Sequence, residues 1–283
     1  MSEQKSNKDI QSGSSSQLGR VGGAGFVTLA GAGPGDAELI TLKLQKRLVE
    51  ADIIITDRLV NPSIISEHAR KNAEIILAGK QGYNEASVSQ EEINKLIVKN
   101  ALQGKKVLRL KGGDVAFFSN MLDELESIVE NNIPFEIIPG ITAASGASAF
   151  SGIPLTARGY SQGVQFLTFN PNSHYSPDTW KHIAISSDTL VFYMAAKNIT
   201  DLAELLLRYS RKPATPLAII EQATTIHQQV NISTLKDCAV DFAGKNFSSP
   251  SLVIIGEVVK LHEQFAWFRD SEKEGSIFQE LNK

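Results

Sequence analysis

Gly31-Ala32-Gly33-Pro34-Gly35-Asp36 follows directly on the strand-forming run 26–29 and is the first of several glycine-rich turns in the sequence. Similar runs at 75–77, 107–110 and 135–138 lead into Gly79-Lys80, Lys111-Gly112-Gly113-Asp114 and Pro139-Gly140-Ile141-Thr142-Ala143. In an open α/β sheet such turns lie at the carboxyl ends of the strands, where ligands bind. Glycine there lets a backbone amide approach a ligand that a Cβ atom would keep away. The turns therefore predict a binding site.

Composition restricts the class of protein. The chain has 283 residues, of which 42% are apolar and 21% charged, as is ordinary for a globular protein with a real core. Its net charge of -3 argues against non-specific binding to nucleic acid, which needs a positive field. The lone Cys238 cannot form an intramolecular disulfide and the start lacks the features of a secretory signal, so we expect a cytoplasmic protein. No run is long and apolar enough to predict a membrane span.

The first part of the chain alternates strands and helices. Residues 1–23 are rich in Ser, Gln and Lys, which predicts a disordered polar tail. Residues 24–138 are predicted to form an α/β domain with a largely parallel sheet. Its expected strands are 26–30, 52–56, 74–78, 107–110 and 135–138, and its expected helices are 37–50, 62–70, 90–103 and 120–131. Asp36 is expected to cap the first helix, and Ser89 with Glu92 forms a capping box for the third.

The pattern changes after Pro139, which predicts a second α/β domain over 139–268 and a polar tail over 269–283. A helix of small residues at 142–150 is expected first, then strands near 164–169, 189–194 and 217–221 and one clear helix at 198–210. The later runs 225–233 and 251–259 follow each other with no long helix between them. This spacing predicts antiparallel pairing in a mixed sheet.

Each turn taken alone has more than one interpretation. The first invites a dinucleotide site, yet Asp36 stands where the third glycine of that motif should be, which argues against a nucleotide-binding dehydrogenase. Asp57 and Arg58 could be a catalytic pair or a simple ion pair, and Lys80 could be solvated. The paired glycines before Asp114 present amide donors beside a carboxylate, a mixture that adenosine and methionine groups need. Small residues after Thr142 would expose helix amides to a flat ligand or serve only tight packing.

The order of these segments is more specific than any one of them. GAGPGD, TDRLV, GK, QEEIN, VLRLKGGD, IPFEIIPGITAASGASAFSGIPLTARG, VFYM and SLVIIGEVV follow one another between residues 26 and 259. In this order the chain closely resembles the tetrapyrrole methylase family, and within it the uroporphyrinogen-III C-methyltransferases. The resemblance implies two α/β domains with a cofactor cleft between them, a mostly parallel first sheet and a mixed second sheet.

The resemblance also implies an activity. A homodimer would bind S-adenosyl-L-methionine, without a metal, and transfer two methyl groups in succession to uroporphyrinogen III. The products would be S-adenosyl-L-homocysteine and precorrin-2, which serves the synthesis of sirohaem or cobalamin. The family's cofactor contacts correspond to Pro34, Gly112, Gly113, Asp114, Phe117, Thr142, Ala143, Met194 and Ala223. Its proton acceptor corresponds to Asp57 and its proton donor to Lys80. Because the substrate carries many carboxylates, we expect Arg58, Lys111 and Arg158, together with Lys80, to gather around it.

The chain departs from the family pattern at two places. After Asp114, relatives commonly read P-F-x-F-G-R-G-x-E-E, whereas residues 115–124 read VAFFSNMLDE. The histidine expected before Arg158 is Ala157. These changes leave open an altered substrate, or a cofactor-binding protein without catalysis. Methylation of a later corrin intermediate is less favoured by the Asp57-Arg58-Leu59-Val60 segment.

Overall fold

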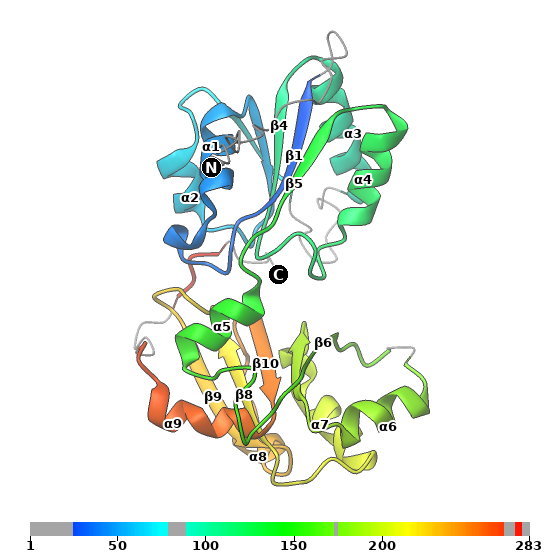
Figure 1. Cartoon of the computed structure of the whole chain (residues 1–283), viewed down its shortest axis with the longest axis vertical. Helices are drawn as coiled ribbons and strands as arrows, with labels where there is room; N and C mark the ends of the chain where they lie inside the picture. Colours follow the sequence, from blue (N-terminus) through cyan, green and yellow to red (C-terminus); the bar gives the residue numbers. More distant parts are fainter. Residues whose placement is uncertain (1–24, 79–88, 173–174, 269–274, 279–283) are drawn as a thin grey trace, which may run out of the picture.

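The described residues form two five-stranded sheets, and each sheet carries its own helices (Figure 1). The computed structural model describes residues 25–78, 89–172, 175–268 and 275–278. We call the part built on the first sheet the first lobe and the part built on the second sheet the second lobe. The tail expected at 1–23 and most of the one expected at 269–283 lie outside the described residues. In the part of the chain that is described, no helix has the length and hydrophobicity that a membrane crossing requires.

The first sheet is entirely parallel, with the strand order β3-β2-β4-β1-β5. Its strands are β1 (Phe26–Gly31), β2 (Ile53–Thr56), β3 (Glu74–Leu77), β4 (Lys106–Lys111) and β5 (Phe135–Ile138). Helices α1 (Leu42–Glu50) and α2 (Pro62–His68) cover one face, and α3 (Gln90–Leu102) and α4 (Met121–Glu130) cover the other (Figure 1). The predicted α/β alternation is confirmed.

Alternation along the strands builds two cores on this sheet. In β2, Ile54 packs with Leu44 of α1, whereas Ile53 and Ile55 pack with Ile97 of α3. All of these side chains are fully buried. Burying one such aliphatic side chain contributes about 1.5–3 kcal/mol, so both faces hold the helices in place.

The first expected helix is divided in two. Asp36 caps only the 3-10 turn η1 (Ala37–Leu39) by accepting a hydrogen bond from Glu38 N at 2.9 Å. Thr41 then caps α1 by accepting one from Leu44 N at 3.1 Å. The single helix predicted over 37–50 was therefore wrong, because a second capping residue lies inside it. The capping box at Ser89 and Glu92 is confirmed.

The second sheet is mixed, in the order β6-β7-β10-β8-β9. Its strands are β6 (Val164–Thr168), β7 (Thr189–Tyr193), β8 (Pro216–Glu221), β9 (Gln229–Thr234) and β10 (Ser251–Ile255). Only β6 and β7 pair in parallel. The predicted antiparallel pairing of the runs that become β9 and β10 was wrong, because β8 lies between them and pairs antiparallel with both, so β9 and β10 run in the same direction.

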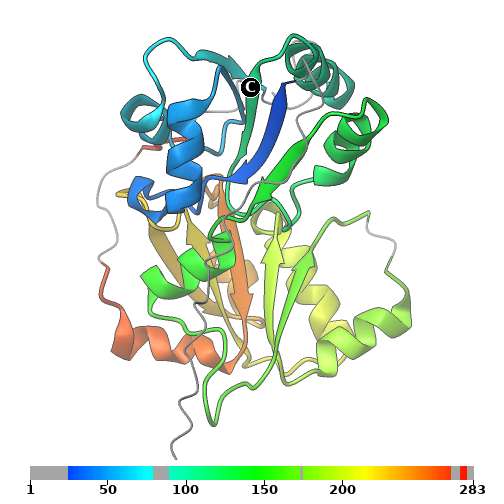
Figure 2. The ribbon, with the colours of Figure 1, turned by 45° about the horizontal axis from the view of Figure 1, so that its top comes forward.

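Helices cover both faces of the second sheet as well. They are α5 (Ala143–Ser151), α6 (Pro177–Ile185), the 3-10 turn η2 (Ala196–Asn198), α7 (Ile199–Arg208), α8 (Cys238–Asp241), the 3-10 turn η3 (Glu257–Leu261) and α9 (His262–Phe265). The chain enters α5 soon after β5, so α5 leads from the first lobe into the second (Figure 1, Figure 2). The sequence analysis missed α6, although Ser176 caps it and Pro177 follows at its start. Its Trp180 and Ile183 are buried in the same core as Phe192.

Three glycines bring the turns after β1, β4 and β5 into contact. A Cβ atom on Gly31 would lie 2.4 Å from Gly113 O, and one on Gly140 would lie 2.3 Å from the same oxygen. Gly33 and Gly113 also exchange backbone hydrogen bonds of 3.1 and 2.8 Å. No side chain fits in this space, so glycine is required for the three turns to form one surface.

We predict that Gly140→Ala destabilises the protein by about 3 kcal/mol, because the new methyl group meets backbone atoms that cannot move aside. Gly244→Ala is the control. Gly244 also lies in a turn, with φ of +72°, but a Cβ atom there meets nothing within 4 Å. Its cost is the left-handed backbone alone, about 1 kcal/mol. Urea unfolding of both variants measures the difference, and equal losses would contradict the packing argument.

Candidate functional site

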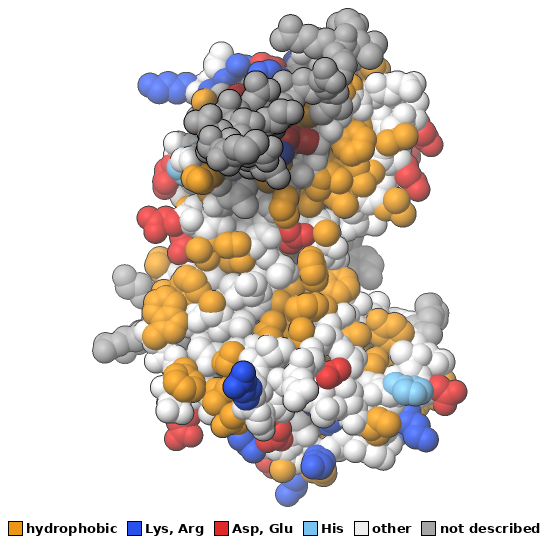
Figure 3. All heavy atoms as spheres, in the orientation of Figure 1, with side chains coloured by type: hydrophobic (Ala, Val, Ile, Leu, Met, Phe, Trp, Pro, Cys, Tyr) orange, Lys and Arg blue, Asp and Glu red, His pale blue; other side chains and the backbone are white. Residues whose placement is uncertain are grey.

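A cavity of about 510 Å³ is lined by residues of both lobes. On the face shown in Figure 3, hydrophobic side chains gather where the lobes meet. Most of the site residues predicted from the sequence line this cavity: Pro34, Asp57, Arg58, Lys111, Gly112, Gly113, Asp114, Phe117, Thr142, Ala143, Met194 and Ala223. They come from segments far apart in the sequence, and the fold brings them together.

Asp114 ties two of the glycine turns to each other. It is 7% exposed, and its Oδ2 accepts a hydrogen bond from Gly140 N at 2.8 Å. Its Oδ1 accepts one from Ala116 N at 2.7 Å. The carboxylate therefore fixes the turn after β4 against the turn after β5, and the backbone of Gly112 and Gly113 forms part of the cavity wall.

Asp57 and Arg58 follow β2 at the same edge. Asp57 accepts hydrogen bonds from Leu59 N at 2.9 Å and from Gly112 N at 3.3 Å, so both carboxylate oxygens are held by the backbone. Arg58 donates from Nη2 to Ser249 Oγ at 3.0 Å and thereby links the first lobe to the second. Burial lowers the pKa of the Arg58 guanidinium, and the nearby Asp57 carboxylate opposes that change.

The start of α5 forms another part of the wall. Thr142 Oγ1 and Tyr193 Oη lie 2.6 Å apart, and Ala144 N donates to the same Tyr193 oxygen at 3.2 Å. Burial raises the pKa of the Tyr193 hydroxyl above its usual value, so it stays protonated near neutral pH. Gly146 lets α5 approach the first turn, since a Cβ atom there would lie 2.5 Å from Pro34 Cβ.

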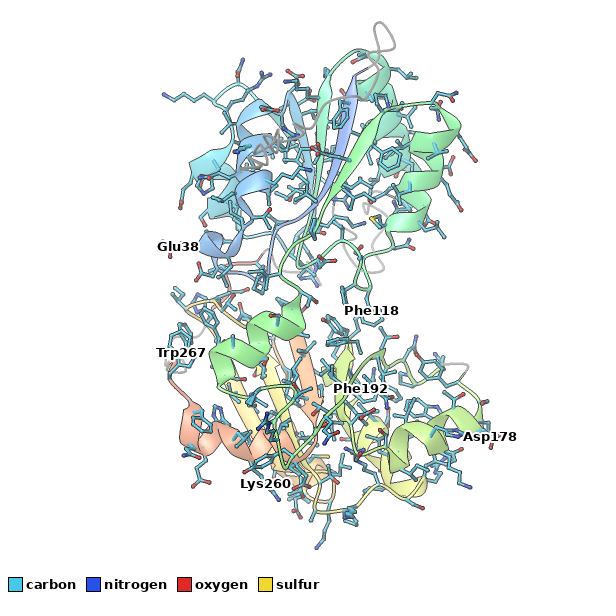
Figure 4. All side chains as sticks on the ribbon, in the orientation of Figure 1. Glu38, Phe118, Asp178, Phe192, Lys260 and Trp267 are labelled. Atoms are coloured by element: carbon cyan, nitrogen blue, oxygen red, sulfur yellow. The ribbon has the colours of Figure 1, made fainter. Side chains whose placement is uncertain are left out.

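Two aromatic contacts connect the lobes beside the cavity. The rings of Phe117 and Phe166 meet edge to face with centroids 5.5 Å apart, and those of Phe118 and Tyr193 lie 4.8 Å apart. Figure 4 shows Phe118 extending from the first lobe toward the second. Phe118 and Met194 have φ of +52° and +59°, a conformation that non-glycine residues rarely adopt and that often occurs at functional sites.

The three other basic residues predicted for the site, Lys111, Arg158 and Lys80, are placed differently from Arg58. Lys111 reaches the cavity wall, but its ammonium is ion-paired with Glu124. Arg158 is exposed in the turn between Ala157 and Ser161, and it is not among the residues that line the cavity. Lys80 lies outside the described residues. Within the described ranges, no group of three or more His, Cys, Asp or Glu side chains could hold a metal ion.

Sequence reasoning missed several lining residues: Phe118, Tyr193, Lys197, Phe247, Ser249 and Pro250. Tyr193 and Phe118 lay inside segments already singled out, VFYM and 115–124, so their neighbourhood was a usable signal. No local signal in the sequence marked Lys197, Phe247 and Ser249, because their segments reach the cavity through the pairing of β10 with β7 and β8.

Glycine backbone, small helix residues and aromatic rings surround a cavity of the size that small-molecule sites have, with a few polar groups converging on it. Such a wall fits a flat heteroaromatic group beside a charged one. The residues present are thus suited to an adenosyl cofactor.

Comparison with known proteins gives the same family for sequence and fold. The family model of the tetrapyrrole (corrin/porphyrin) methylases matches residues 27–239. Siroheme synthase of Pseudomonas putida (strain W619) is 44% identical over 250 residues, which are 88% of this chain and 53% of that protein. Siroheme synthase of Actinobacillus succinogenes is 43% identical over 256 residues, which are 90% of this chain and 53% of that protein. The chain spans about half the length of these relatives.

Solved structures agree. The native form of uroporphyrin III C-methyl transferase from Thermus thermophilus has a TM-score of 0.71 and 33% identity, covering 84% of this chain and 100% of its own. The same enzyme complexed with S-adenyl homocysteine has a TM-score of 0.70 and 32% identity, covering 84% of this chain and 94% of its own. With the family model matching most of its length, this chain belongs to the tetrapyrrole (corrin/porphyrin) methylases.

Proposed function

We propose that the protein is an S-adenosyl-L-methionine-dependent C-methyltransferase that converts uroporphyrinogen III to precorrin-2 by two successive methylations. The observation that carries the proposal is one cavity that is lined by the residues corresponding to the family's cofactor positions and by Asp57, which corresponds to its proton acceptor. A solved relative that shares 32% of its sequence was crystallised with S-adenyl homocysteine, which supports the same donor here.

In this proposal the donor is held by Pro34, the Gly112-Gly113-Asp114 turn, Thr142, Ala143 and Met194, with backbone contacts from Phe117 and Ala223. S-adenosyl-L-methionine supplies a methyl group that its positive sulfur has already activated. The protein's main task is then to hold donor and acceptor carbon in line and to exclude water. The aromatic contacts of Phe117 and Phe118 close one side of the cavity and serve that exclusion.

Asp57 is proposed as the proton acceptor and Lys80 as the donor. When a new carbon–carbon bond forms at a pyrrole carbon, the ring system becomes cationic and must release a proton. Asp57 can receive it, because its carboxylate lines the cavity and is fixed by Leu59 N and Gly112 N. A fixed base needs no rearrangement at the moment of transfer.

The substrate is a polycarboxylate, and Arg58 and Lys111 are the proposed binding cations on the cavity wall. Arg158 is exposed and would meet only the outer part of such a substrate. The homodimer and the cytoplasmic setting are proposed from the family resemblance and the single buried Cys238.

We expect the purified protein to form a doubly methylated product from uroporphyrinogen III and S-adenosyl-L-methionine, with two equivalents of S-adenosyl-L-homocysteine. Mass spectrometry of both products under anaerobic conditions is the measurement. Donor binding without turnover would favour a protein that binds the cofactor but does not catalyse. Turnover of a later corrin intermediate alone would overturn the proposed substrate.

We also expect Asp57 and Asp114 variants to separate the two roles. Asp57→Asn should lower kcat about a hundredfold, because an amide cannot accept the proton, and should weaken donor binding less than Asp114→Ala, because its one oxygen can still accept from Leu59 N or Gly112 N. Asp114→Ala should weaken S-adenosyl-L-homocysteine binding about tenfold, because the Gly113 turn loses its bonds to Gly140 and Ala116.

Steady-state kinetics and calorimetry give the two readouts. Asp178→Ala is the control, since Asp178 is exposed at the far end of the second lobe (Figure 4). Equal losses of donor affinity in the Asp57 and Asp114 variants would refute this division of roles.

A further inference from the structure

A buried network of charges lies behind the cavity wall. Arg109 and Lys111 are two residues apart on β4, so both side chains point to the face that α4 covers. Glu124 of α4 meets both, with its Oε1 at 2.8 Å from Arg109 Nε and its Oε2 at 3.0 Å from Lys111 Nζ. Arg109 is 3%, Lys111 4% and Glu124 0% exposed. One carboxylate therefore faces two cations away from water.

Arg109 and Lys111 differ in how many hydrogen-bond acceptors they have. Arg109 also donates to Ile55 O at 3.3 Å and to Leu110 O at 3.1 Å. Lys111 has three N–H donors, and among the described residues Glu124 is its one hydrogen-bond partner. Of the network, only Lys111 lines the cavity. Lys111 thus combines a place in the cavity lining with a nearly buried ammonium that has N–H donors left over beside its bond to Glu124.

Electrostatics favour an anion at this place. Burial lowers the pKa of the Lys111 ammonium, Glu124 opposes the change, and Arg109 adds to it. Asp57 also attracts Lys111, but it forms no ion pair with it and bonds the backbone instead. Buried charges are stable when each is paired and hydrogen-bonded, and here the second positive charge has no carboxylate of its own.

We propose that Lys111 binds a carboxylate group of a ligand in the cavity, and that Glu124 is a positioning residue that holds the Lys111 ammonium at the wall. This inference rests on the proposed function, which offers two sources of that chemistry. One is a carboxylate of the tetrapyrrole, and the other is the carboxylate in the methionine part of the methyl donor.

The test compares Lys111→Met with Arg109→Met in the full chain. Each variant removes one positive charge from the same network and leaves Glu124 paired with the remaining cation, so each should fold with reduced thermal stability. Of the two residues, Lys111 belongs to the cavity lining and Arg109 does not. Binding is measured with S-adenosyl-L-homocysteine, with 5′-methylthioadenosine, which lacks the amino-acid part, and with uroporphyrin III, the oxidised form of the proposed substrate.

We expect Lys111→Met to raise the Kd of one carboxylate ligand about tenfold or more and to leave 5′-methylthioadenosine within about twofold. If only the binding of S-adenosyl-L-homocysteine is weaker, Lys111 binds the carboxylate of the donor. If only the binding of uroporphyrin III is weaker, and the KM for the tetrapyrrole is raised, Lys111 binds a carboxylate of the substrate. Arg109→Met should change each Kd by less than about threefold. Glu124→Gln should weaken the same ligand as Lys111→Met, but less.

Failure of this inference is distinct from failure of the proposed function. If the wild-type protein methylates its substrate and the Lys111→Met and Arg109→Met variants bind every ligand alike, the carboxylate role of Lys111 is refuted and the activity stands. If the wild type binds the ligands without methylating, the activity is refuted and the binding comparison still decides the role of Lys111. A wild type that binds none of these ligands overturns both.

Discussion

The contact among the backbones of Gly31, Gly113 and Gly140 is the constraint on which the site depends. This contact brings the turns after β1, β4 and β5 so close together that no side chain fits between them. Asp114 then joins the β4 turn to the β5 turn by accepting a hydrogen bond from Gly140 N, Ala116 N of its own turn holds the other carboxylate oxygen, and the Gly112 amide fixes Asp57 beside them. Gly33, Gly112 and Gly113 therefore bring backbone to the cavity wall of the first lobe, at positions where the close approach of the turns leaves little room for side chains.

Acidic and basic groups at the cavity are held in different ways. The carboxylates of Asp57 and Asp114 accept hydrogen bonds from backbone amides that belong to the fold itself, so they are fixed before any ligand arrives. The cations are held by side chains instead, Arg58 by Ser249 and Lys111 by Glu124. Preorganised carboxylates suit proton transfer, whereas cations with unused donors suit recognition of an anionic ligand.

Local pattern was enough to locate the strands of both sheets, the capping box at Ser89 and the turns that line the cavity, but the run predicted over 251–259 ends as β10 at Ile255 and continues as the 3-10 turn η3. It was not enough where two local signals compete, as at Asp36 and Thr41, or where pairing is decided by a third strand, as for β9 and β10. The burial of Lys111 against Glu124 depends on how α4 packs on β4, which neither segment reveals alone. Arg158 lies in a segment that matches the family pattern, but in the structure it is exposed in a turn and is not among the residues that line the cavity.

Among the described residues, hydrogen bonds and ring contacts link the lobes beside the cavity, for example Arg58 with Ser249, Asp36 N with the Thr224 hydroxyl, and Phe117 with Phe166. Each lobe has its own hydrophobic cores, so each can in principle lose its order separately. A molecule seated in the cavity touches both and favours the state in which both are intact. A ligand bound there would therefore couple the unfolding of the two lobes, which in the described part of the chain are joined covalently through the segment between β5 and α5.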